Sequence, residues 1–169
     1  MIRGLVLFCL FSLSSLLSAQ DITGYWKRLN PETGNTQCVI TIYEYQEEYF
    51  GRIVSTYDDQ GKMKDNLHNP VYRAEKVAGS PFYCGMDLLL NLQEEGSKYR
   101  GRIINPKSGK FYDCSVWVRD GNLVIRGEFM FFGRSETWFP IEESDFPKDF
   151  KKPNASTFVP VIPSRRDEN

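Results

Sequence analysis

Arginine side chains on the expected strands are the residues of this chain best suited to bind a ligand. Arg52 and Arg102 occupy the same place in two copies of the pattern Tyr-x-Gly-Arg-Ile, and Arg126 follows on a later strand. A guanidinium presents paired N–H donors that fit a carboxylate or a phosphate. If the expected strands form a barrel and these three candidate ligand-binding side chains point into it, they would form an anion-binding cluster. Pointing outward, as charges on strand faces more often do, they would form ion pairs of little energetic weight.

A catalytic cysteine is not expected. After residue 20 the chain has three cysteines, Cys38, Cys84 and Cys114, and its single histidine, His68, lies in a loop-like stretch. A thiol nucleophile needs a nearby base such as histidine. The odd number of cysteines allows at most one disulfide, and the alternative is that all three are buried as small hydrophobic side chains.

Neither a metal centre nor a hydrolytic pair of carboxylates stands out. The cysteines are not closely spaced, and Asp58-Asp59 lacks the spacing of a calcium loop. Two strand carboxylates could meet in space, but nothing distinguishes one pair among Asp87, Glu128 and Glu136. We therefore expect a protein that is not an enzyme and that uses no cofactor or metal.

The stretch from residue 99 to residue 139 predicts the sheet that must position these side chains. It is rich in aromatic and β-branched residues and is divided by turn residues, which predicts four antiparallel strands: Tyr99 to Asn105, Lys110 to Val118, Leu123 to Phe132 and Arg134 to Phe139. Earlier strands are expected near residues 22–28, 38–45, 49–57 and 87–92. The chain is therefore expected to be all-β, with about eight strands.

Turn residues predict how the strands are joined. The segments at residues 30–34 and 105–109 share the layout Asn-Pro-x-x-Gly, so we expect the same turn in both, and Asp120-Gly121 is a strong hairpin signal. Glycines inside strands mark bulges or bends by which a sheet curls enough to close. We expect four such corners: Gly51, Gly101, Gly127 and Gly133.

The N-terminal segment predicts a secretory signal peptide over residues 1–19. Arg3 precedes an apolar run from Leu5 to Leu17, and small residues lead to a cleavage site after Ala19. Cleavage leaves 150 of the 169 residues, enough for one domain and without a membrane span. Loss of Arg3 changes the net charge from −1 to −2, which argues against nucleic acid as a partner. We expect an exported protein of the periplasm or the extracellular space.

Two long segments lack regular periodicity. Residues 58–85 are rich in Gly, Pro and Asn and predict one irregular loop, either a binding mouth or an ordered cover for one end of the core. Residues 141–169 are charged and proline-rich and predict an extended tail, whose apolar segment 158–162 could dock on the barrel. The barrel domain is expected over residues 20–140.

Five motifs follow one another along residues 22–139: Gly24-Tyr25-Trp26, a repeated Gly-Arg-Ile, Asn-Pro-x-Ser-Gly-Lys at 105–110, Val-Ile-Arg-Gly at 124–127, and Gly-Arg-Ser-x-Thr-Trp at 133–138. In this order they resemble a bacterial exported family known as domain of unknown function 2147. The resemblance implies a lipocalin-like, up-and-down antiparallel barrel in the bacterial envelope. It implies no activity.

The resemblance also implies that certain residues close the barrel. In lipocalin-like proteins the tryptophan of the first Gly-x-Trp closes one end, and a basic residue from the last strand packs over its ring. Gly24 and Trp26 match that motif, Arg134 matches the cation, and Trp138 belongs to the closing motif. An arginine packed over an indole ring contributes about 0.5 to 2 kcal/mol to stability. The presence of these residues is therefore explained by the barrel's structure without a binding site.

Together these patterns predict a single lipocalin-like, up-and-down β-barrel with a long irregular loop near residues 58–85. We expect it to bind a small, partly apolar molecule without catalysis, since small closed barrels either fill with side chains or hold one ligand. The alternative is a filled barrel that acts as an envelope structural or protein-interaction module. Aromatic residues make up 14% of the chain and could fill such an interior. Any protein partner is left open.

Overall fold

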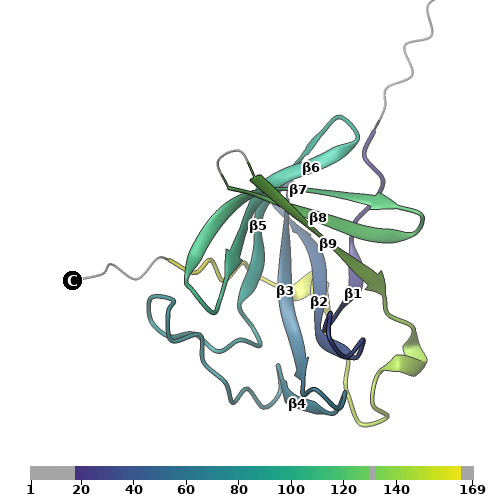
Figure 1. The fold of residues 1–169 in the computed structure, drawn as a ribbon, viewed down its shortest axis with the longest axis vertical. Coiled ribbons are helices and arrows are strands. Elements are labelled where there is room, and N and C mark those ends of the chain that lie inside the picture. Colours follow the sequence, from purple (N-terminus) through teal and green to yellow (C-terminus); the bar gives the residue numbers. More distant parts are fainter. Residues whose placement is uncertain (1–17, 130–131, 165–169) are drawn as a thin grey trace, which may run out of the picture.

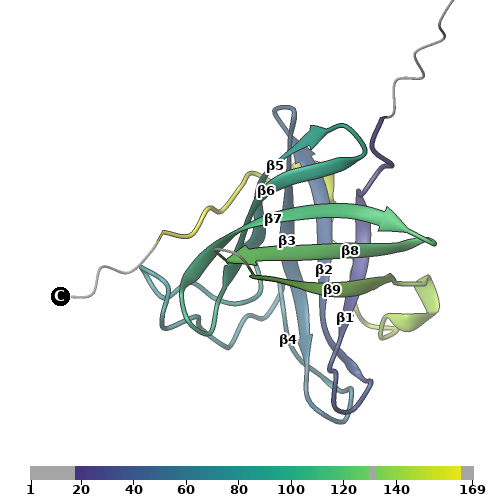
Figure 2. The ribbon, with the colours of Figure 1, turned by 45° about the horizontal axis from the view of Figure 1, so that its top comes forward.

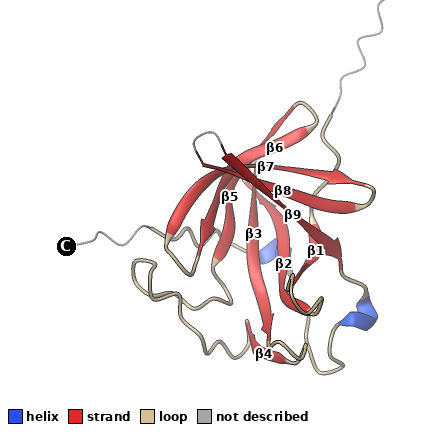
Figure 3. Ribbon diagram, in the orientation of Figure 1, coloured by secondary structure: helices blue, strands red, loops and turns tan. Residues whose placement is uncertain are grey.

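The computed structural model describes residues 18–129 and 132–164, and almost all regular structure in them is β-strand (Figure 1, Figure 3). The tail adds two short 3₁₀ helices, η1 (Glu143–Asp145) and η2 (Ala155–Thr157). The strands are β1 (Gly24–Leu29), β2 (Thr36–Tyr45), β3 (Glu48–Tyr57), β4 (Met63–Asn66), β5 (Asp87–Glu95), β6 (Lys98–Asn105), β7 (Lys110–Arg119), β8 (Asn122–Phe129) and β9 (Phe132–Pro140).

The strands form one antiparallel sheet that closes on itself. Their order is β2-β1-β9-β8-β7-β6-β5-β3-β4, and the additional pairing of β2 with β3 joins the two sides of this order (Figure 2). Eight strands therefore make the ring, and β4 extends it as a short hairpin on β3. This confirms the predicted all-β, up-and-down antiparallel barrel.

Side chains from all eight barrel strands meet in one buried cluster. Strand pairing places these side chains next to one another. Trp26 lies opposite Ile40, Ile40 lies opposite Ile53, and Val116 lies opposite Ile125, each pair on neighbouring strands. Burial of one such aliphatic side chain contributes about 1.5 to 3 kcal/mol. The inner face of the barrel is therefore the face that carries these residues.

The predicted turns have the expected backbone geometry. In both Asn-Pro-x-x-Gly turns the glycine N–H donates to the asparagine carbonyl at 2.8 Å, with φ of 72° at Gly34 and 67° at Gly109. Asp120 and Gly121 both have positive φ, 51° and 76°, as a type I′ hairpin requires. The two Asn-Pro-x-x-Gly segments do form the same turn, as their shared sequence predicts.

The loop near residues 58–85 begins with regular structure that the sequence did not predict. The Asp58 carboxylate accepts from the N–H groups of Gln60 and Lys62, which folds the chain back so that β4 pairs with β3. The rest of the loop contributes Ala74, Val77 and Cys84 to the buried barrel cluster, and Met86, directly after the loop, joins them. Of the two alternatives for this loop, these buried contacts match the ordered cover.

The tail lies against the outer wall of the barrel, on the far side of β2, β3 and β5 in Figure 1. Phe146 is buried in a second apolar cluster with Val39, Val54 and Tyr57. Further along, the Tyr25 hydroxyl donates to the Pro153 carbonyl at 2.6 Å. Apart from its two 3₁₀ helices, the described part of the tail has no regular structure, and it covers the outer wall.

The last hairpin has different boundaries from the prediction. A strand to Phe132 and a break at Gly133 were expected, but β8 ends at Phe129 and β9 begins at Phe132. Residues 130–131 between them lie outside the described residues. Phenylalanine and methionine are not typical turn residues, and glycine is. The predicted break between the strands therefore fell at Gly133, the first glycine after them.

Two of the predicted corner glycines allow a matched test of close packing. A Cβ at Gly101 would lie 2.6 Å from the Leu90 carbonyl oxygen, whereas a Cβ at Gly127 would meet nothing closer than Ile103 at 3.9 Å. We expect Gly101→Ala to lower the free energy of unfolding by about 1 to 3 kcal/mol because backbone must move. Gly127→Ala should be neutral or stabilise by up to about 1 kcal/mol. Urea unfolding of both variants measures the two changes in free energy. Equal effects would show that Gly101 is not more closely packed than Gly127.

Candidate functional site

A buried ion pair lies on the outer wall of the barrel, beneath the tail. Arg52 on β3 pairs with Asp87 on β5 across the sheet. The guanidinium donates from Nε to Asp87 Oδ1 at 3.1 Å and from Nη2 to Oδ2 at 2.9 Å. The carboxylate is fully buried and Arg52 is 7% exposed. Such a fork-to-fork pair combines charge with fixed geometry.

Tyr43 completes this group, which we call the tail clamp (Arg52, Asp87 and Tyr43). Its hydroxyl donates to the Asp87 carboxylate at 3.0 Å and accepts from Arg52 Nη2 at 3.0 Å. Burial, reinforced by the neighbouring carboxylate, raises the pKa of Tyr43 above its ordinary value. The hydroxyl therefore keeps the proton that it donates to Asp87.

The tail clamp holds an extended stretch of the tail by its backbone. Arg52 Nη2 donates to the Val159 carbonyl at 2.6 Å, and Asp87 Oδ2 accepts from the Val161 N–H at 2.6 Å. The Phe158 ring lies 4.5 Å from the Arg52 guanidinium, in a cation–π contact. The apolar segment predicted to dock does so here, through charged groups of the wall.

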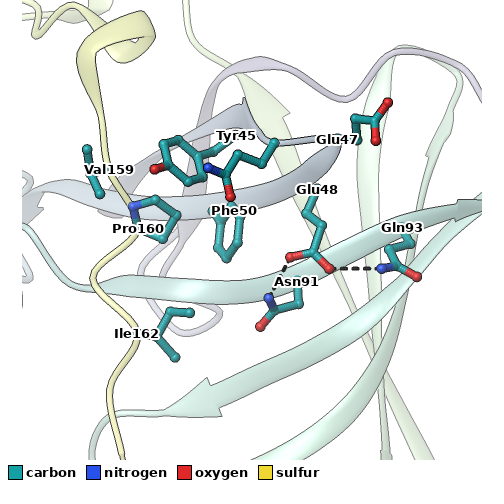
Figure 4. A pocket seen from close by; sticks show the side chains of 10 residues that line it. Tyr45, Glu47, Glu48, Phe50, Asn91, Gln93, Val159, Pro160 and Ile162 are labelled. Carbon is teal, nitrogen blue, oxygen red and sulfur yellow. Dashed lines mark hydrogen bonds between the residues drawn. The ribbon is translucent and has the colours of Figure 1, made fainter.

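A pocket opens beside this stretch, between the tail and the β2–β3 hairpin (Figure 4). Its volume is about 520 Å³. We call it the tail pocket; it is lined by Tyr45, Gln46, Glu47, Glu48, Phe50, Asn91, Gln93, Val159, Pro160 and Ile162. Figure 4 shows three groups of side chains around it. The tail residues lie on one side, Tyr45 and Phe50 lie in the middle, and Glu48 lies on the other side with Asn91 and Gln93.

The polar end of the tail pocket is a carboxylate held by two amides. Glu48 accepts from Asn91 Nδ2 at 2.7 Å and from Gln93 Nε2 at 2.8 Å. Asn91 lies in a bulge of β5, where the pairing with β6 shifts register, and its φ is 50°. Asparagine tolerates this left-handed conformation better than most residues. Gly101 makes room for the bulge, because any Cβ there would collide with the Asn91 carbonyl oxygen.

The three candidate ligand-binding arginines do not converge on one site. Arg52 is beneath the tail, whereas Arg102 and Arg126 are exposed. The Arg102 guanidinium lies 5.7 Å from the Phe111 ring, and that of Arg126 lies over Gly133. None of the three lines the tail pocket.

Among the predicted barrel-closing residues, the tryptophans are the most deeply packed. Trp26 is 7% exposed, and its indole N–H donates to the Ile22 carbonyl at 2.9 Å, where the chain approaches β1. Trp138 is fully buried and Gly24 has a φ of 121°. Arg134 is exposed, and the cation–π contacts between described residues do not join it to Trp26. The role of Arg134 over that ring stays a prediction.

The strand carboxylates considered for hydrolysis have separate surroundings. Asp87 belongs to the tail clamp, Glu128 is exposed, and Glu136 forms an ion pair with Arg28 at 2.7 Å. Within residues 18–129 and 132–164, no group of three or more His, Cys, Asp or Glu residues is placed to hold a metal ion. None of the helices in the described ranges is long and apolar enough to cross a bilayer.

Sequence reasoning missed the polar end of the tail pocket. Asn91 interrupts an apolar run of leucines, and this polar residue was the available signal for an irregular position. Glu48 lies between the strands expected near residues 38–45 and 49–57, although it is the first residue of β3. Nothing local in the sequence indicates that the two side chains meet.

The three cysteines within the described residues are buried and free of disulfides: Cys38, Cys84 and Cys114. Burial raises the pKa of the Cys38 and Cys114 thiols to about 12 from an ordinary value of 9.0. For Cys84, burial together with the Asp65 carboxylate also raises the pKa. The structure thus matches the alternative of three small buried side chains, and the thiols are poor nucleophiles.

These thiols predict how stability depends on alkaline pH. Because Cys38 and Cys114 lose their protons near pH 9 when unfolded but near pH 12 when folded, the unfolded state binds fewer protons between these values. Their contribution is therefore fully present below pH 9 and falls by up to about 1.4 kcal/mol per pH unit for each thiol above it. Urea unfolding from pH 8 to 11 measures the slope. The double variant Cys38→Ala, Cys114→Ala should show a shallower slope. An unchanged slope would show that these two thiols do not cause the loss of stability at alkaline pH.

The tail clamp predicts a large effect for one carboxylate and a small effect for another. Asp87→Ala leaves a buried guanidinium without its counter-charge and should lower the free energy of unfolding by about 3 to 5 kcal/mol. As a control, Glu95→Ala removes an exposed ion pair with Arg100 and should cost about 0 to 1 kcal/mol. Urea unfolding compares the two, and limited proteolysis should cleave the tail faster only in Asp87→Ala. Similar losses in both variants would show that the clamp does not hold the tail.

Comparison with known proteins agrees with the fold. A solved structure, described as protein HP1028 from the human pathogen Helicobacter pylori belonging to the lipocalin family, matches with a TM-score of 0.57 and 13% sequence identity. The match covers 74% of this chain and 86% of that one, and at this identity it shows the fold alone. No curated protein matches the chain. A family model described as "Uncharacterized protein conserved in bacteria (DUF2147)" matches residues 24–139, so this chain belongs to that family.

Proposed function

We propose that this chain is an exported, non-enzymatic binding protein that holds one small, partly apolar molecule in the tail pocket. The observation that carries the proposal is the pocket itself, whose volume of about 520 Å³ lies within the range of small-molecule sites. Half of the lining is apolar, from Tyr45, Phe50 and the tail, and the other half is polar, which suits a ligand that is itself only partly apolar.

The position of the pocket follows from how the barrel is built. The inner face carries the continuous buried cluster, whereas the tail pocket lies on the outer wall. The tail converts that open wall into a concavity, with Val159, Pro160 and Ile162 as its second side. The tail clamp fixes these residues by their backbone, which leaves their side chains to face a ligand.

The second candidate function is a protein-interaction module of the envelope. The observation that favours it is the exposure of large apolar side chains, at 46% to 60%, on the loop and the tail: Val71, Tyr72, Val159, Val161 and Ile162. Exposed apolar groups of this kind are typical of surfaces that meet another protein.

Export depends on the segment over residues 1–19, most of which lies outside the described residues. Cleavage after Ala19 would remove Ser18 and Ala19, which donate to Glu94 at 2.8 Å. The mature mass therefore reports directly on whether the N-terminal segment has been processed.

Native mass spectrometry of the protein purified gently from its own cells tests the proposal. We expect a mass that fits cleavage after Ala19, together with an adduct of a few hundred daltons that is lost on denaturation. Val159→Trp should reduce the adduct because it fills the pocket without touching the backbone clamp, whereas Val71→Trp alters a similarly exposed valine outside it. A bare mass in all three proteins would contradict ligand binding and favour the interaction module.

A further inference from the structure

We infer that the ligand of the tail pocket is an organic cation, an amine attached to an apolar body. This inference rests on the proposed function and adds the chemical class of the ligand. It comes from the charge of the pocket lining, from the hydrogen-bonding state of its polar end, and from the aromatic rings beside that end.

The charge of the lining disfavours an anionic ligand. Two of the ten lining residues are carboxylates, Glu47 and Glu48, and none of the ten is Lys, Arg or His. Arg52 is close in sequence to the lining residues Glu48 and Phe50. Its guanidinium, however, is neutralised by Asp87 and also donates to the Val159 carbonyl. A carboxylate or phosphate in this pocket would thus face negative charge without a cation to balance it.

The hydrogen bonds at the polar end leave acceptors in excess. Each oxygen of Glu48 accepts from one amide, at 2.7 Å from Asn91 and 2.8 Å from Gln93. A carboxylate has about four acceptor sites, so about two remain for a ligand. Each amide also keeps a carbonyl oxygen that only accepts. An ammonium group, with three donors and no acceptor, complements this set.

The two amides also fix the direction of the carboxylate. Asn91 and Gln93 come from the same strand, and the bulge between Leu90 and Gln93 shifts the register at this point. Because both oxygens of Glu48 are held, the charge is oriented before a ligand arrives. Such preorganisation lowers the entropic cost of binding.

The aromatic side chains suit the rest of the ligand. Tyr45 and Phe50 line the pocket between Glu48 and the tail (Figure 4). The face of an aromatic ring attracts a cation, and its area covers an apolar body. Val159 and Ile162 add aliphatic surface on the tail side. A ligand with a charged amine at the Glu48 end and an apolar body toward the tail would use every part of the lining.

Three probes of similar shape and different charge test the inference on the protein purified from its own cells. They are phenethylammonium, the neutral phenethyl alcohol and the anionic hydrocinnamate, with affinities measured by calorimetry at equal ionic strength. We expect phenethylammonium to bind about tenfold more tightly than the alcohol, and hydrocinnamate to bind most weakly. This comparison in the wild-type protein needs no substitution.

Two charge-neutralising substitutions on one hairpin locate the effect. Glu48→Gln should remove the preference for phenethylammonium while phenethyl alcohol still binds, which also checks that the pocket persists. Glu44→Gln removes an exposed carboxylate that does not line the pocket, and it should leave the preference unchanged.

The outcomes separate this inference from the proposed function. Equal binding of amine and alcohol, or tightest binding of hydrocinnamate, would overturn the cationic class and leave the binding function in place. A preference lost equally in Glu48→Gln and Glu44→Gln would overturn the assignment to Glu48. Failure of all three probes to bind, together with a bare native mass, would overturn the proposed function itself.

Discussion

The buried ion pair between Arg52 and Asp87 is the interaction on which the tail and its pocket depend. Two charges removed from water cost several kcal/mol each unless every donor and acceptor finds a partner. Tyr43 supplies one partner, and the tail backbone at Val159 and Val161 supplies the others. The tail is therefore part of the folded domain, since without it two charges of the barrel wall would lose part of their hydrogen bonding.

Local chemistry explains what could be predicted from the sequence. Asp120-Gly121 requires positive φ at both positions, and the Asn-Pro-x-x-Gly segments close through their own asparagine carbonyl, so these turns need no distant residue. The turns and the β-branched runs between them lead to an antiparallel meander, and internal glycines such as Gly101 indicate where it bends. An all-β barrel follows from these features together.

Distant contacts explain what could not be predicted. Arg52 and Arg102 share the same local pattern, yet one is buried and the other exposed. The difference comes from the tail, because Val159, which accepts from Arg52, is 107 residues away in sequence. The meeting of Glu48 with Asn91 likewise depends on a bulge and on strand pairing. Candidate ligand residues chosen by type and spacing alone therefore missed the tail pocket.

If the tail pocket holds a ligand as proposed, the wall that the pocket shares with the tail couples ligand binding to tail docking. A molecule that contacts Val159, Pro160 and Ile162 binds the docked tail in preference to the undocked one. By linkage, the ligand then stabilises docking to the same extent that docking strengthens its affinity. With a ligand bound as proposed, any event that separates the tail from the wall would also release the ligand, and the C-terminal segment would be the part of the chain through which another molecule could empty the pocket.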